Sequence, residues 1–235
     1  MGKFSIVSTP VGNLEDISFR ALTTIKEADM VLAEDTRTIS NILKKYNIRA
    51  KFVTSFFEGN EQAKIPEILV KISEGQNIAL VSESGTPLIS DPGYKLVKEL
   101  IKNNITVESV PGPTALITAL TLSGLPPNSF LFLGFLPKKE SKAKKILKDV
   151  NLALHKAESL KTVILYESPH RLLKTLYLIK EVFAETEVVV SRELTKIHEE
   201  TRREPISSSI DHFQKQKPKG EFVISFSPKQ SQPQY

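Results

Sequence analysis

Cysteine is absent from this chain of 235 residues. Its absence excludes disulfide bonds, thiolate metal sites and a cysteine nucleophile, and is compatible with a reducing cytosol. Long apolar runs are missing too, because none reaches the roughly 18 residues that a membrane span needs. The start, Met-Gly-Lys-Phe-Ser-Ile-Val, has neither a signal-peptide layout nor a myristoylation motif. We therefore expect a cytoplasmic protein without a membrane anchor.

Phosphate-binding glycine motifs are also missing. None of the ten glycines stands in a Gly-x-Gly pair, and no Gly-Lys-Ser or Gly-Lys-Thr occurs. This argues against a Rossmann dinucleotide site and against a P-loop. The four histidines, at positions 155, 170, 198 and 212, show no close pairing. We therefore expect no bound metal.

Strand-like and helical patterns alternate along the chain, which predicts an α/β fold with largely parallel sheets. The strand-like runs are 4–8, 30–33, 51–55, 77–82, 106–110, 130–134, 162–166, 187–191 and 221–225. The helical patterns are 18–28, 61–73, 94–103, 114–123, 143–158, 171–183 and 206–214. A break in composition at 122–129 divides the chain into two α/β domains, 1–121 and 122–227. The polar tail, 228–235, is expected to be disordered.

Four polar loops follow strands of the first half, at 8–17, 33–37, 81–93 and 110–115. In a parallel sheet these loops gather at one edge, where open α/β sheets bind ligands. Glycines in three of them allow the backbone to approach a ligand closely. An ordinary strand-to-helix turn is the alternative for any one loop taken alone.

Several polar residues in the loops allow two interpretations. Glu34 and Asp35 are a candidate base or substrate ligand, or equally the cap of a helix at Thr36. His170 and Arg171 stand at the expected start of a helix, where an anion could bind, and the alternative is a surface histidine. The run 137–145 holds five lysines in nine residues. It is either a set of phosphate contacts or a solvated helix start.

Seven motifs carry a family resemblance when they are taken together and in order. They are Thr9-Pro-Val-Gly-Asn-Leu-Glu-Asp-Ile17, Ala33-Glu-Asp-Thr-Arg37, Ser84-Gly-Thr-Pro-Leu-Ile-Ser-Asp-Pro-Gly93, Pro111-Gly-Pro-Thr-Ala-Leu116, Gly134-Phe-Leu-Pro137, Tyr166-Glu-Ser-Pro-His-Arg171 and Arg192-Glu-Leu-Thr-Lys196. The chain thereby resembles the tetrapyrrole methylase superfamily. Within it, the chain is similar to the branch that methylates a cytidine 2'-hydroxyl in the decoding region of small-subunit (16S) ribosomal RNA. The resemblance extends over nearly the whole chain.

The resemblance implies a two-domain tetrapyrrole-methylase-like fold, in which each domain is a mainly parallel sheet with flanking helices. It also implies S-adenosylmethionine (SAM) in a cleft between the domains, a homodimer, and small-subunit rRNA or the assembled small ribosomal subunit as substrate. The family's SAM contacts carry over to Val11, Gly12, Glu83, Ser84, Gly85, Thr114, Ala115, Glu167, Leu194 and Gly220. The family commonly has Asp-Ala where this chain has Glu83-Ser84.

Methyl transfer from SAM needs no metal, and its main requirement is positioning the nucleophile within about 3–3.5 Å of the methyl group. A ribose hydroxyl is a poor nucleophile, so a base should assist it. The candidates are Asp35, Glu34, Glu193 and His170, and Asp35 is favoured because its loop follows a strand of the first half. The candidate RNA contacts are Arg37, Lys138, Lys139, Lys142, Lys144, Lys145 and Arg171. Two alternatives stay open, a small-molecule (tetrapyrrole-type) methyltransferase and a non-catalytic RNA-binding protein of this fold.

Overall fold

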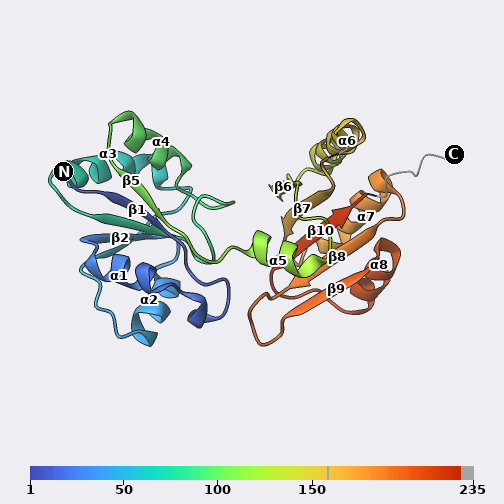
Figure 1. Cartoon of the computed structure of the whole chain (residues 1–235), viewed down its shortest axis with the longest axis horizontal. Coiled ribbons are helices and arrows are strands. Elements are labelled where there is room, and N and C mark those ends of the chain that lie inside the picture. The colour runs from blue at the N-terminus through green and yellow to red at the C-terminus, as the bar shows by residue number, and fades with distance from the viewer. Residues whose placement is uncertain (158, 229–235) are drawn as a thin grey trace. The chain divides into compact units, whose positions relative to one another are not determined.

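Two five-stranded sheets form the framework of the computed structural model, which describes residues 1–157 and 159–228 (Figure 1). The chain divides into two compact units, Met1–Thr114 and a second that begins at Ala115. The division lies earlier than the expected boundary after residue 121. The reason is that helix α5 (Ala115–Ser123) packs on strands of the second unit, so the composition break follows this helix. The predicted tail falls almost wholly on 229–235, outside the described residues.

The sheet of the first unit is parallel and has the strand order β3-β2-β4-β1-β5. Its strands are β1 (Phe4–Val7), β2 (Met30–Ala33), β3 (Val53–Ser55), β4 (Ile78–Val81) and β5 (Val107–Val110). Both β2 and β4 are buried along their whole length. Their continuous apolar runs are the pattern expected for strands that are covered on both faces.

Helices cover both faces of this sheet (Figure 1). They are the 3-10 helix η1 (Leu14–Asp16), α1 (Phe19–Glu27), α2 (Thr36–Lys45), α3 (Glu61–Ser73) and α4 (Tyr94–Lys102). One core cluster joins α3 and α4 to one face, and a second cluster joins α1 and α2 to the other. Because the two clusters take alternate residues of β2, the strand's period of two assigns each side chain to one core. Because all pairings in this sheet are parallel, the carboxyl ends of the five strands lie at the same edge, where the predicted loops begin.

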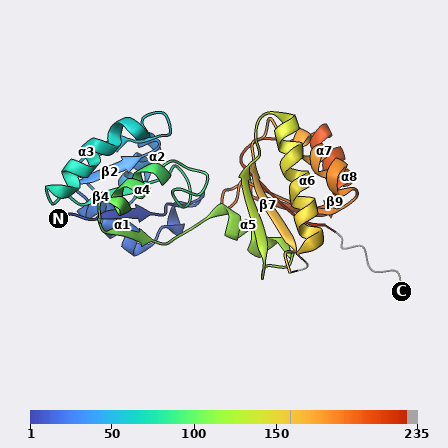
Figure 2. The same cartoon turned by 90° about the horizontal axis from the view of Figure 1, so that it is seen from above.

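The second unit has a mixed sheet with the strand order β6-β7-β10-β8-β9. Its strands are β6 (Phe130–Phe135), β7 (Thr162–Glu167), β8 (Glu187–Arg192), β9 (Glu200–Pro205) and β10 (Phe222–Ser227). Helices α6 (Glu140–Lys156), α7 (Leu172–Phe183) and α8 (Ile206–Lys215) cover one face and α5 lies against the other (Figure 2). The two-domain α/β fold class is confirmed.

The expectation of a mainly parallel second sheet is wrong. Within the described residues, β6 pairs with β7 in parallel, whereas the other three pairings are antiparallel. The cause is the hairpin of β8 and β9, which reverses the chain direction. Each helical connection still joins strands that run the same way, as crossover connections require. Strand β9 escaped prediction because its sequence, Glu-Thr-Arg-Arg-Glu-Pro, has no apolar alternation and forms a charged edge strand.

Across the two described stretches of chain, no helix combines the length and the apolar character that a membrane crossing requires.

Candidate functional site

The loops after β1 and β4 are joined by hydrogen bonds at the carboxyl edge of the first sheet. The backbone N–H of Thr9 donates to the carbonyl of Gly85 at 2.8 Å, and the N–H of Gly85 donates back at 3.1 Å. The hydroxyl of Ser84 donates to the carbonyl of Val11 at 3.0 Å. Gly85 has a φ of +82°, a backbone conformation that favours glycine. The two loops therefore hold each other in a single arrangement.

The loop after β5 is attached to the same pair. The Thr86 hydroxyl donates to the carbonyl of Pro113 at 3.0 Å and lies 2.9 Å from the hydroxyl of Ser8. A Cβ at Gly85 would lie 3.7 Å from the carbonyl oxygen of Pro113 and 3.8 Å from the Cα of Thr114. Three loops thus converge around one glycine, as their positions after parallel strands predict.

The predicted SAM contacts of the first unit all lie on these three loops. They are Val11, Gly12, Glu83, Ser84, Gly85 and Thr114. Val11 and Gly85 are buried, whereas Glu83 is exposed. Ala115, the remaining predicted contact of the first half, is the first residue of α5 and belongs to the second unit.

Glu34 connects the loop after β2 to the loop after β4. Burial raises the pKa of the Glu34 carboxyl above its usual value, and the nearby carboxylate of Glu83 raises it further. A hydrogen bond from the Glu83 backbone N–H opposes this rise. Glu34 is therefore a half-buried acid beside a second acid, at the same edge of the sheet as the joined loops.

Asp35 caps helix α2, which was one of its two predicted roles. Its carboxylate accepts the backbone N–H of Arg37 at 2.8 Å and the Arg37 guanidinium at 2.5–3.0 Å. The Arg37 side-chain and backbone hydrogen bonds lower the pKa of Asp35 to about 2. The Arg37 side chain is nonetheless 90% exposed. Sequence alone could not separate capping from catalysis, because both place a carboxylate directly after a strand.

The buried Glu167 and the partly buried Arg171 form an ion pair at the end of β7. The Glu167 carboxylate accepts hydrogen bonds from the Thr175 hydroxyl at 2.5 Å and from the Ser168 N–H at 2.8 Å. The Nε of Arg171 lies 3.6 Å from the same carboxylate. The Nη2 of Arg171 donates to the carbonyl of Leu136 at 2.7 Å. The pair thus ties the start of α7 to the loop that follows β6.

This arrangement leaves Arg171 little freedom to bind an RNA phosphate, since its guanidinium also donates to the carbonyl of Pro137 at 3.3 Å. His170, its neighbour, is exposed. His170 therefore remains accessible as a candidate.

Glu193, Leu194 and Gly220 meet where β8 ends and β10 begins. The Glu193 carboxylate accepts the Glu221 N–H at 3.1 Å and the Lys196 ammonium at 3.0 Å. Burial raises the pKa of Glu193, but the hydrogen bonds from Lys196 and Glu221 outweigh burial, and the pKa lies below its usual value. Leu194 is 4% exposed. The Glu193 carboxylate therefore connects the end of β8 to the start of β10 through these hydrogen bonds.

The predicted lysine cluster lies at the start of α6. Lys144 forms an ion pair with Glu181. The side chains of Lys138, Lys139, Lys142 and Lys145 are exposed. Four lysines of the set are therefore accessible to an anionic partner.

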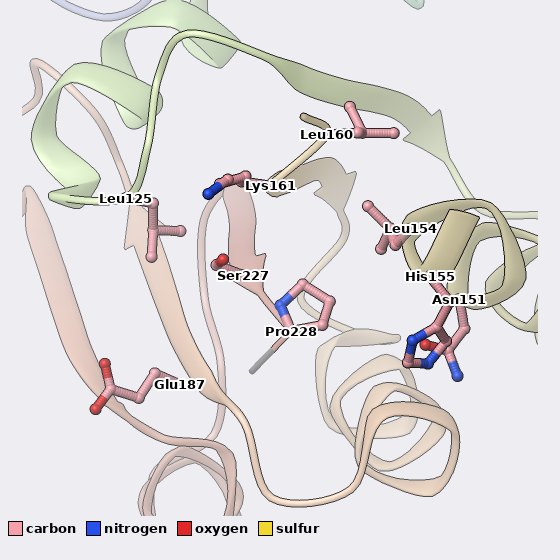
Figure 3. A pocket seen from close by; sticks show the side chains of 9 residues that line it. All are labelled: Leu125, Asn151, Leu154, His155, Leu160, Lys161, Glu187, Ser227 and Pro228. Carbon is pink, nitrogen blue, oxygen red and sulfur yellow. The ribbon is translucent and has the colours of Figure 1, made fainter. Parts of the chain in front are cut away.

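A hollow of about 310 Å³ lies at the other edge of the second sheet, where β7 and β8 begin. Leu154, His155, Lys161 and Glu187 are among its lining residues (Figure 3). It includes no residue that the sequence predicted for the site. In the parts of the chain that the structure describes, no group of three or more acids or histidines could hold a metal ion.

Comparison with known proteins identifies the family of this chain. The family of Tetrapyrrole (Corrin/Porphyrin) Methylases matches residues 3–209. The chain belongs to this family. The resemblance read from the seven motifs is thereby confirmed.

Curated relatives match along nearly the whole chain. A protein of Thermotoga maritima named ribosomal RNA small subunit methyltransferase I is 46% identical, over 98% of this chain and 100% of that protein. A protein of Hydrogenobaculum sp. with the same name is 45% identical, over 96% of this chain and 95% of its own. These relatives support the resemblance to the ribosomal branch.

Solved structures confirm the fold. The methyltransferase CobJ has a TM-score of 0.73 at 15% identity and covers 97% of this chain and 95% of its own. Uroporphyrin-III C-methyl transferase from Thermus thermophilus, complexed with S-adenyl homocysteine, has a TM-score of 0.64 at 16% identity. It covers 95% of this chain and 97% of its own. At these identities the likeness concerns the fold alone.

Proposed function

We propose that this protein transfers a methyl group from SAM to the ribose 2'-hydroxyl of a cytidine in the decoding region of small-subunit (16S) ribosomal RNA. The observation that carries the proposal is the match of 41–46% identity to proteins named ribosomal RNA small subunit methyltransferase I. Such a substrate places the protein in the cytoplasm. The homodimer expected from the family is part of the same proposal.

The joined loops of the first unit fit a methyl donor of this kind. Hydrogen bonds between the loops around Gly85 and Val11 fix the backbone there, and the chain has no glycine motif for a phosphate cradle. Burial and the nearby Glu83 carboxylate both raise the pKa of the Glu34 carboxyl, so negative charge at Glu34 is disfavoured there. A cationic sulfonium near the two carboxylates would favour that charge. When bound, SAM supplies an activated methyl group.

We propose Glu34 as the base that assists the ribose hydroxyl, in preference to Asp35. The Asp35 carboxylate already holds the Arg37 guanidinium and caps α2, and its pKa is about 2. The raised pKa of Glu34 makes it the stronger base of the two, and general bases work best with a pKa near the operating pH. His170 and Glu193 remain candidates of lower rank. The Glu193 carboxylate already accepts a hydrogen bond from the Lys196 ammonium.

For RNA binding we propose the four exposed lysines at the start of α6, together with Arg37. These side chains project into solvent, where ammonium and guanidinium groups can neutralise backbone phosphates. Arg171 is no longer among the preferred contacts, since its guanidinium is bound to Glu167 and two carbonyls.

A small-molecule methyltransferase is the second candidate, because solved structures of this fold include uroporphyrin-III C-methyltransferase. The test offers radiolabelled SAM with purified small subunits, free 16S rRNA or uroporphyrinogen III. We expect label in the RNA, in one nucleoside that behaves as 2'-O-methylcytidine. Label in the tetrapyrrole alone would overturn the proposal. Absence of SAM binding in a calorimeter would favour the non-catalytic RNA-binding protein.

A further inference from the structure

An exposed phenyl ring stands at the carboxyl end of the edge strand β3. Phe57 is 45% exposed. The register pairs Ser55 with Ala33, and the N–H of Phe56 donates to the carbonyl of Ala33 at 2.8 Å. Phe57 therefore follows β3 in the position that corresponds to Asp35 after β2. The ring belongs to the same edge of the sheet as the candidate base Glu34.

The turn that carries this ring is tightly held. The Asn60 side chain accepts the Phe57 N–H at 2.8 Å and donates to the carbonyl of Ser55 at 3.2 Å. The N–H groups of Asn60 and Glu61 both donate to the Phe57 carbonyl at 3.0 Å. A Cβ at Gly59 would lie 2.8 Å from the ring's Cε2, so the ring's position requires a glycine there. The backbone that carries the ring therefore needs little further ordering when a ligand covers the ring.

The charges around the ring favour a base over a phosphate. Glu58, next in the chain, is exposed and would repel an anion at the turn. The cationic groups belong to neighbouring elements instead, with the exposed Arg37 on α2 and with Lys64 on α3 bound to the Thr54 hydroxyl at 2.6 Å. Unpaired RNA bases present flat faces that stack on aromatic rings whatever their sequence.

We propose that Phe57 is a substrate-positioning residue that stacks on an unpaired base of the RNA, beside the site of methyl transfer. The inference rests on the proposed function, since it takes RNA as the substrate. It assigns the phosphate contacts to the lysines and Arg37, and the base contact to Phe57. The free energy of RNA binding should therefore have a part that depends on salt, from the phosphate contacts, and a part that does not, from the base contact.

The chain contains no tryptophan, which allows a direct optical test. Phe57→Trp introduces a single indole at the proposed stacking site. Phe52→Trp is the matched control, because Phe52 is 53% exposed and precedes the same strand at its other end. We expect single-stranded oligocytidylate to quench the fluorescence of the first variant and not of the second. Polyphosphate, which has charge but no bases, should quench neither. Equal responses at both positions, or quenching by polyphosphate, would overturn the inference.

Steady-state methylation of small-subunit rRNA gives the second readout. Phe57→Ala should raise KM for RNA about 5- to 150-fold, which is the equivalent of ~1–3 kcal/mol for one stacked base. The Kd for SAM and the salt dependence of RNA binding should stay unchanged. Phe57→Tyr should restore KM, and Phe52→Ala should match the unaltered protein.

The outcomes separate this inference from the function on which it rests. An unaltered protein that methylates no rRNA contradicts the proposed function. An active protein whose KM is insensitive to Phe57→Ala contradicts the stacking contact alone. A Phe57→Ala variant that loses SAM affinity instead would assign the ring to the cofactor and also overturn the inference.

Discussion

Gly220 is the position where a single added methyl group should damage the candidate site most clearly. Its φ is +93°, and a Cβ there would lie 2.5 Å from the Oε1 of Glu193. An L-residue in left-handed backbone costs about 1–2 kcal/mol. Displacing the Glu193 carboxylate also weakens its hydrogen bonds to Glu221 and Lys196, where one bond to a charged group is worth about 1.5–3 kcal/mol. Gly220→Ala should therefore destabilise the second unit by about 2.5–5 kcal/mol.

Gly124→Ala is the matched control. Gly124 has a φ of +74° in the same unit, with nothing within 4 Å of its Cβ position. Gly124→Ala should lower the free energy of unfolding only by the cost of the left-handed backbone, about 1–2 kcal/mol. In the double variant Gly220→Ala/Glu193→Ala the methyl group no longer meets a carboxylate. The two substitutions should therefore be non-additive by about 1–3 kcal/mol.

Hydrogen exchange of the β8 and β10 amides is the suitable assay, because it reports opening of the second unit without assuming that both units unfold together. The reasoning fails if Gly220→Ala costs no more than Gly124→Ala. It also fails if the two substitutions at 220 and 193 are additive.

Three further outcomes are expected. Glu34→Gln should lower kcat and remove the decline of activity at low pH. The reason is that the pKa of Glu34 is raised, so its base form is lost as pH falls. An unchanged pH profile would exclude Glu34 as the base. Asp35 has a pKa of about 2 in the folded protein, below the value of about 3.9 in an unfolded chain, so its stabilising contribution is complete above pH 4 and declines as pH falls towards 2. Urea titrations of Asp35→Asn should therefore differ from those of the unaltered protein at pH 7 and converge near pH 2. Alanine at Lys138, Lys139, Lys142 and Lys145 should flatten the slope of log Kd for RNA against log salt by about 0.7 for each phosphate that is no longer neutralised, and an unaltered slope would place the RNA elsewhere.

The first unit follows from its sequence more fully than the second. The buried runs of β2 and β4 and the helical patterns between strands determine a parallel sheet, and a parallel sheet brings its loops to one edge. The motif at 84–93 does meet the loops after β1 and β5 at that edge. In the second unit, strand β9 is charged and exposed at an edge, so no apolar period marked it. Its hairpin then changed the direction of β10, the strand that follows.

The roles of single carboxylates could not be predicted, because they depend on partners from other elements of the fold. Glu193 is held by Glu221, and Glu167 is held by Thr175 from within α7. Burial raises the pKa of Glu34, and the carboxylate of Glu83 raises it further because β2 lies beside β4. These partnerships form only when the sheets do.

Mass-spectrometric mapping of 16S rRNA from cells with and without the gene for this chain tests the central claim most directly. We expect one 2'-O-methylated cytidine in the decoding region to disappear with the gene and to return when the unaltered protein is supplied. The Glu34→Gln protein should restore it poorly. An identical methylation pattern in the two strains would contradict the account.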